Sequence, residues 1–206
     1  RRMDGCTLPQ TRRLQCLHAG FFEWARKHPN EVAVWDGGQP VTRGALAHRA
    51  RCMAAGLREE GVGYGDAVEV CLPRGTDQVA AVYAILSLGA CYVPLDMDQP
   101  PVRRRLIEES AGVGAVIATR QDLSTQPPRY GVHELAMRAP LNTPPDVDAN
   151  ACAYVIYTSG STGIPKGVAE RELGALKKAF GWADDQLRDR SLRANEGPGN
   201  VLLAVL

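Results

Sequence analysis

Residues 154–168 read YVIYTSGSTGIPKGV. Four β-forming residues run straight into a loop that holds three glycines, four hydroxyl residues and one lysine. Glycine lets the backbone turn its N–H groups inward without a Cβ in the way, while hydroxyls and a lysine add donors for phosphate oxygens. The stretch therefore predicts a strand that delivers a nucleotide-phosphate loop.

Two other interpretations of this loop have to be weighed. The common phosphate loop carries a GKS or GKT tripeptide that leads into a helix, whereas here Pro165 stands directly before Lys166 and stiffens the segment. Composition alone would also fit an ordinary Gly/Ser hairpin loop. The ordered string TSGSTGxPKG favours phosphate binding, because it closely resembles the phosphate loop of the adenylate-forming, AMP-binding superfamily. The resemblance is strongest to the amino-acid adenylation domains of nonribosomal peptide synthetases.

Bulk composition narrows the class of protein. A chain of 206 residues with 45% hydrophobic residues suits one domain with a core. The 24 basic and 23 acidic residues are mixed along the chain, so no basic stripe indicates a nucleic-acid partner. No apolar run suggests a membrane span or a signal segment, and we expect a cytoplasmic location. A chain that begins with arginine is compatible with a piece of something longer.

The six cysteines form no Cys-x-x-Cys pair and lie mostly within apolar runs. This pattern predicts buried, reduced thiols rather than a disulfide framework or a metal site.

Periodicity along the chain predicts an α/β fold. A helix is expected over residues 14–28, a β-hairpin over 32–42, and a helix capped by Thr42 after it. Strands are then expected at 67–72, 91–95 and 113–118, with helices at 76–88 and 101–111. Strand–helix alternation with short connectors favours parallel pairing, and such sheets bind ligands beyond the carboxyl ends of their strands. The loop after Tyr157 would lie at such an end.

Residues 119–150 are rich in proline and short polar residues, which predicts a surface excursion without long helices.

A second stretch, LSLGACYVPLD at 86–96, resembles the L-x-x-G-x-A-Y-V-P-L-D element of the same family, with Cys91 in place of a usual alanine. Residues 41–46 depart from the family's T-Y-x-E-L by lacking the tyrosine and the glutamate. The resemblance covers residues 14–168. It implies the incomplete N-terminal part of an adenylate-forming domain, with a largely parallel sheet flanked by helices.

The resemblance also implies a chemistry. An amino-acid carboxylate attacks the α-phosphate of Mg-ATP, giving an aminoacyl adenylate and pyrophosphate, and the aminoacyl group then passes to the phosphopantetheine of a carrier protein. ATP, Mg, the amino acid and the carrier protein are thus the implied cofactors and partners, with no membrane or nucleic-acid partner. The implied nucleotide-binding residues are Thr158, Ser159, Gly160, Ser161, Thr162, Gly163, Lys166 and Gly167. Lys166 would meet the β- and γ-phosphates.

The family's later motifs are not found in residues 169–206, so no catalytic set is complete. We expect an enzyme fragment that binds nucleotide without completing catalysis alone. Helical spacing predicts a helix over 169–180, followed by a turn and an apolar strand at 201–206.

The strings AEREL at 169–173 and EGPGN at 196–200 resemble a segment of RNA 3′-terminal phosphate cyclases. The expected organisation is a leader at 1–13, a truncated adenylation core at 14–168 and a tail of different or uncertain origin at 169–206. The alternatives are a non-catalytic remnant or interaction module, or a fusion with a cyclase segment that processes RNA ends. No aromatic-plus-basic surface supports the last.

Overall fold

The computed structural model of the chain describes residues 16–158, 165–172 and 174–175. The helices are α1 (Leu17–Lys27), α2 (Arg43–Glu59), α3 (Thr76–Ser87), α4 (Pro101–Ala111) and α5 (Val132–Ala136). The strands are β1 (Val32–Asp36), β2 (Gln39–Thr42), β3 (Ala67–Cys71), β4 (Cys91–Pro94), β5 (Val113–Ala118), β6 (Arg129–Gly131), β7 (Cys152–Thr158) and β8 (Lys166–Arg171). The predicted α/β class is confirmed.

Six of the strands form one sheet in the order β6-β5-β3-β4-β7-β8, and β1 and β2 form a separate antiparallel hairpin. Neighbours from β6 to β7 are parallel, and only β7 and β8 pair antiparallel. Helices α3 and α4 supply the crossovers that parallel neighbours require. The carboxyl ends of β3, β4, β5 and β7 therefore share one edge of the sheet, which confirms the predicted largely parallel arrangement.

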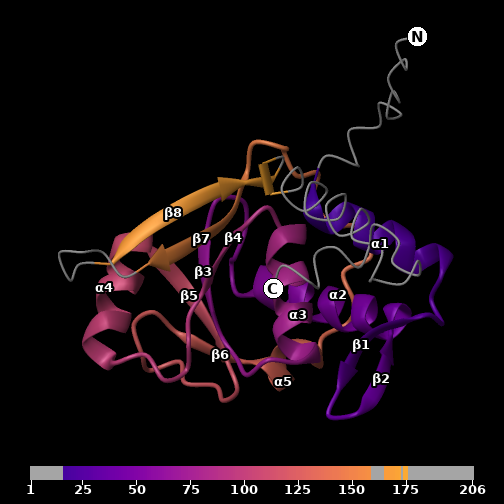
Figure 1. Cartoon of the computed structure of the whole chain (residues 1–206), viewed down its shortest axis with the longest axis horizontal. Coiled ribbons are helices and arrows are strands. Elements are labelled where there is room, and N and C mark those ends of the chain that lie inside the picture. The colour runs from indigo at the N-terminus through magenta and orange to yellow at the C-terminus, as the bar shows by residue number, and fades with distance from the viewer. Residues whose placement is uncertain (1–15, 159–164, 173, 176–206) are drawn as a thin grey trace, which may run out of the picture.

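The sheet separates two apolar layers (Figure 1), with α1, α2 and α3 on one side and α4 on the other. Val68 and Val70 of β3 belong to the larger layer. Side chains alternate along a strand, so Glu69 between them faces Arg104 of α4. The central strand thus presents a carboxylate to the smaller layer.

The larger layer is closed by helix packing. The ring of Tyr83 on α3 is fully buried and stacks on Phe21 of α1, with ring centroids 4.0 Å apart. The predicted cap of α2 is present, because Thr42 Oγ1 accepts a hydrogen bond from the Ala45 N–H at 3.2 Å. The inner face of α2 is buried: Leu46, Ala50, Met53, Ala54 and Leu57.

The predicted surface excursion over 119–150 is wrong in its middle. Strand β6 extends the sheet beside β5, and α5 follows directly. Tyr130, Val132 and Leu135 are buried in the larger layer. The strand is only three residues long, so it leaves no alternating pattern that a sequence could reveal.

The predicted helix over 169–180 is wrong at its start. Strand β8 runs through Arg171, and Ala169 pairs with Val155 of β7. Residues 169–171 are good helix formers, but the ladder to β7 determines their conformation. Helical backbone begins only at Glu172. Beyond Glu172, the structure describes only residues 174–175 of the predicted tail, and their backbone is helical.

Candidate functional site

The predicted phosphate loop connects the two antiparallel strands β7 and β8. Thr158 is the last residue of β7 and pairs with Lys166, the first residue of β8. Both side chains are exposed. The pairing therefore brings the first hydroxyl and the lysine of the loop to opposite sides of its base, at the carboxyl end of a strand in the parallel part of the sheet.

The rest of the loop falls outside what the structure describes. The predicted site residues Ser159, Gly160, Ser161, Thr162 and Gly163 are among residues 159–164. Of the loop positions that are described, Pro165 is buried directly before the exposed Lys166. The fixed φ of the buried Pro165 restricts the backbone directly before the exposed Lys166.

Gly167 has a packing role that the sequence analysis did not anticipate. It pairs with Tyr157, and a Cβ at Gly167 would lie 2.8 Å from Tyr157 Cζ and 3.0 Å from Val155 Cγ1. The Tyr157 hydroxyl in turn lies 3.1 Å from Ser110 Oγ of α4. Absence of a side chain at Gly167 lets the Tyr157 ring lie over β8 and connect the base of the loop to α4.

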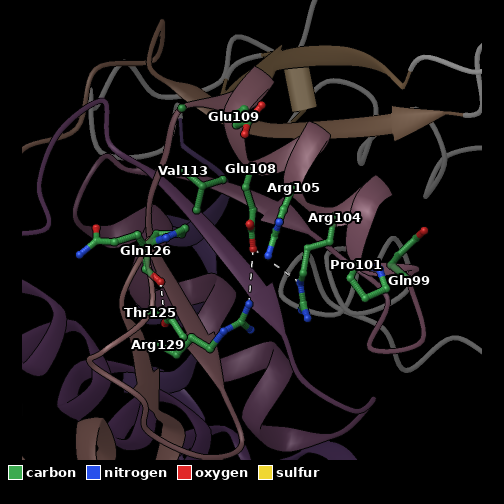
Figure 2. Close-up of a pocket in the computed structure, with 12 residues that line it drawn as sticks. Gln99, Pro101, Arg104, Arg105, Glu108, Glu109, Val113, Thr125, Gln126 and Arg129 are labelled. Carbon is green, nitrogen blue, oxygen red and sulfur yellow. Dashed lines mark hydrogen bonds and ion pairs between the residues drawn. The ribbon is translucent and has the colours of Figure 1, made fainter.

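A second polar site lies between α4 and residues 125–129 (Figure 2). Arg104 donates to Glu69 Oε1 through Nε at 3.1 Å and through Nη2 at 2.9 Å. Glu108 lies between two arginines, with its Oε1 atom 3.6 Å from Arg104 Nε and 3.5 Å from Arg129 Nη2. The arginines are thus engaged by carboxylates of the same fold, and this pocket is explained as an ion-pair network.

Glu69 is the unusual member of this network. Its side chain is fully buried, and its Oε2 atom has no hydrogen-bond partner within the described part of the chain. Burial raises the pKa of Glu69 to about 7, although the Arg104 guanidinium opposes the shift. The carboxyl group can therefore take up a proton near neutral pH.

A pair of cysteines was also missed. Cys91 at the start of β4 and Cys152 at the start of β7 have their sulfur atoms 2.8 Å apart. They are separated by 61 positions, so no local motif reveals the pair. The available signal was indirect: both begin strands, and parallel neighbours bring their amino ends to the same edge.

The described ranges contain neither a candidate metal site nor a membrane-spanning helix. No group of three or more His, Cys, Asp or Glu side chains there could hold a metal ion. Among the helices that the structure describes, none has the length and apolar character needed to cross a membrane.

Comparison with known proteins agrees with this geometry. The family model for AMP-binding enzymes matches residues 21–206. The chain belongs to the AMP-binding enzyme family. This AMP-binding chain is 54% identical over 160 residues to the pyochelin synthetase PchE of Pseudomonas aeruginosa, a match that covers 78% of this chain and 11% of PchE. It is 37% identical over 157 residues to the phenyloxazoline synthase MbtB of Mycobacterium tuberculosis, covering 75% of this chain and 11% of MbtB.

Solved structures give the same assignment. The nonribosomal peptide synthetase FmoA3 in its AMPPNP-bound form aligns with a TM-score of 0.73 and 32% identity, over 85% of this chain and 19% of FmoA3. The N-terminal subdomain of Klebsiella oxytoca NpsA aligns with a TM-score of 0.72 and 24% identity, over 81% of this chain and 43% of that chain, and supports the fold.

The AMP-binding chain thus corresponds to the N-terminal part of a nonribosomal peptide synthetase adenylation domain, and it spans about a tenth of the length of PchE. These comparisons do not show the resemblance to RNA 3′-terminal phosphate cyclases, and the match to the AMP-binding model runs through the segment where that resemblance was expected.

Proposed function

We propose that the loop between β7 and β8 binds the polyphosphate of ATP during activation of an amino acid. Lys166 would meet the β- and γ-phosphates, and Thr158 would donate its hydroxyl from the facing strand. The remaining proposed donors are Ser159, Gly160, Ser161, Thr162, Gly163 and Gly167. Mg would neutralise charge on the leaving pyrophosphate, and the aminoacyl group would pass to phosphopantetheine on a carrier protein.

The observation that carries this proposal is the pairing of Thr158 with Lys166 at the loop end of the hairpin. It holds a cation and a hydroxyl on one base while leaving both exposed to a ligand. Phosphoryl chemistry needs charge neutralisation and positioning more than a proton-accepting residue, and the Thr158–Lys166 pair would supply both. AMPPNP in the related FmoA3 structure is consistent with the same ligand class here.

We do not expect this chain alone to complete the activation and transfer of an amino acid. The later motifs of the family were not found in its sequence, so we infer nucleotide binding without full turnover in the isolated chain. The different or uncertain origin of the tail at 169–206 and the cytoplasmic location remain predictions of the same kind.

ATP and AMP binding in the presence of Mg²⁺ tests the role of Lys166. Removal of the ammonium in Lys166→Ala should weaken ATP binding about tenfold, the effect of losing one charge-assisted contact, and should leave AMP binding nearly unchanged. The expected selectivity arises because AMP has no β- or γ-phosphate. Isothermal titration calorimetry measures both affinities.

Lys27→Ala is the matched control, because Lys27 lies on α1 and is half exposed in an ion pair with Glu23. Its ATP affinity should equal that of the unaltered chain. Equal losses of ATP and AMP binding in Lys166→Ala would contradict the proposed contact. No ATP binding by the unaltered chain would refute the proposal as a whole.

A further inference from the structure

The sulfur atoms of Cys91 and Cys152 lie within 2.8 Å of each other across two neighbouring strands. Cys91 begins β4 and Cys152 begins β7, and the two strands pair in parallel through Tyr92 and Tyr154. The backbone on both sides is thus held by the sheet. A disulfide needs the sulfur atoms to approach to about 2.05 Å, a shift of less than about 1 Å from where they lie.

The two thiols differ in access. Cys91 is buried, whereas Cys152 is the one cysteine in the described ranges that is not fully buried. The contact with Cys91 lowers the pKa of Cys152 to about 7, and the same contact together with burial raises the pKa of Cys91. An accessible sulfur with thiolate character near neutral pH is the attacking group in thiol–disulfide exchange, and a buried neighbour can act as the resolving thiol.

We propose that Cys91 and Cys152 form a thiol–disulfide exchange site that reacts with low-molecular-weight disulfides such as oxidised glutathione. The Cys152 thiolate attacks one sulfur of the small disulfide, forms a mixed disulfide and releases one small thiolate. Cys91 then attacks Cys152 Sγ and releases the second small thiolate. The proton that Cys91 loses and the proton that Cys152 lost on ionising protonate the two released thiolates. Two protein thiols and one small disulfide become one protein disulfide and two small thiols.

The product connects β4 to β7, the strand whose far end carries the proposed phosphate loop. Because the link closes a long stretch of chain, it restricts the unfolded state and should raise the unfolding midpoint of the oxidised chain. Excess reduced glutathione should cleave the disulfide and return the unfolding midpoint to that of the reduced chain.

Peptide mapping tests the assignment in the full chain. Trypsin cleaves after lysine and arginine, which places each of the six cysteines in a different peptide. After treatment with oxidised glutathione and alkylation of the remaining thiols, we expect one linked species that joins the Cys91 and Cys152 peptides. Before oxidation, Cys152 should react with iodoacetamide at about pH 7 at least about tenfold faster than Cys91.

Two variants identify the order of attack. Cys91→Ala should accumulate a stable mixed disulfide with glutathione at Cys152, because the resolving thiol is gone. Cys152→Ala should form neither the link nor an adduct at Cys91. Cys71, buried on the neighbouring strand β3, is the internal control and should form no glutathione adduct and no disulfide in any native sample.

Three outcomes would overturn the proposal. The first is a native chain that stops at the mixed disulfide, and the second is an adduct at Cys91 in Cys152→Ala. The third is a native chain that is unreactive at both positions, while the same thiols react in urea. Since the main readout is made on the unaltered chain, it does not depend on the folding of a variant or on nucleotide binding.

Discussion

Among single residues, Glu69 is buried at a cost to the fold. A carboxylate in the middle of a parallel strand loses its hydration, and a single arginine compensates only one of its two oxygens. The pKa of about 7 means that the folded chain holds a proton there at pH values where the unfolded chain, with its usual value of 4.5, has lost it.

The sign of the pH dependence follows from this difference. The folded state binds more protons between pH 4.5 and about 7, so stability is greatest below that window and falls as pH rises through it. We expect the free energy of unfolding to drop by about 3 kcal/mol across the window, measured by urea denaturation. Glu69→Gln keeps an acceptor for Arg104 and should remove most of the drop.

Glu109→Gln is the control for this prediction, because Glu109 is exposed on the same helix α4. Its pH profile should match that of the unaltered chain. A Glu69→Gln profile that also falls between pH 4.5 and 7 would assign the effect to another group.

Gly167 is a second position where a single added atom, a Cβ, should change stability. Alanine there would put a Cβ against Tyr157 and Val155, which forces the Tyr157 ring away from β8 and from Ser110. Overpacking of this kind should lower the free energy of unfolding by about 1–2 kcal/mol. Gly114→Ala on strand β5, where a Cβ meets nothing within 4 Å, should cost less than half as much in the same denaturant titration.

A loss in Gly167→Ala no larger than in Gly114→Ala would show that the Tyr157 contact does not depend on the absent side chain. The distinction matters for the loop, since Gly167 was predicted from sequence as a phosphate ligand and lies here in strand β8, paired with Tyr157.

At the scale of elements, agreement with the sequence depended on whether local signals and tertiary contacts pointed the same way. Helix α4 and strand β5 have the predicted limits because Pro101 starts the helix and Gly112, in the left-handed region at φ 62°, ends it. Strand β8 was missed because Ala169, Glu170 and Arg171 favour helix locally, whereas the partner strand β7 favours extension. No local pattern contains that partner.

The first helix depends on a residue from the other end of the described chain. Glu172 is 1% exposed, and its Oε2 atom accepts the Leu17 N–H at 2.8 Å at the start of α1. Cys16 at the cap position makes no side-chain hydrogen bond to the helix, so Glu172 supplies the acceptor and a negative charge at the positive end of the dipole.

Glu172→Ala should therefore cost about 1–2 kcal/mol and speed hydrogen exchange of the first-turn amides of α1. Glu172→Gln keeps an acceptor without the charge, so we expect a smaller loss. Arg171→Ala, at the adjacent exposed position, is the control. Exchange in α1 that is unchanged in Glu172→Ala would refute the capping role.

For the whole molecule, the class of fold and the position of the loop could be predicted, but the order of strands could not. Alternating strands and helices predict parallel pairing, yet nothing in the sequence of β3 indicates that it lies between β5 and β4. Order in a sheet depends on contacts between distant segments. For the same reason, the Cys91–Cys152 pair and the ion-pair network of Glu69 could not be predicted, because each joins elements that are far apart along the chain.

The contact between Glu172 and the start of α1 also bears on how the protein is made. The two residues are 155 positions apart, so the ribosome completes nearly all of the described sheet before the acceptor for the Leu17 amide exists. During that interval the amino end of the nascent helix has only solvent to bond. Emergence of Glu172 from the exit tunnel then links the start of α1 to a segment that is made 155 residues later.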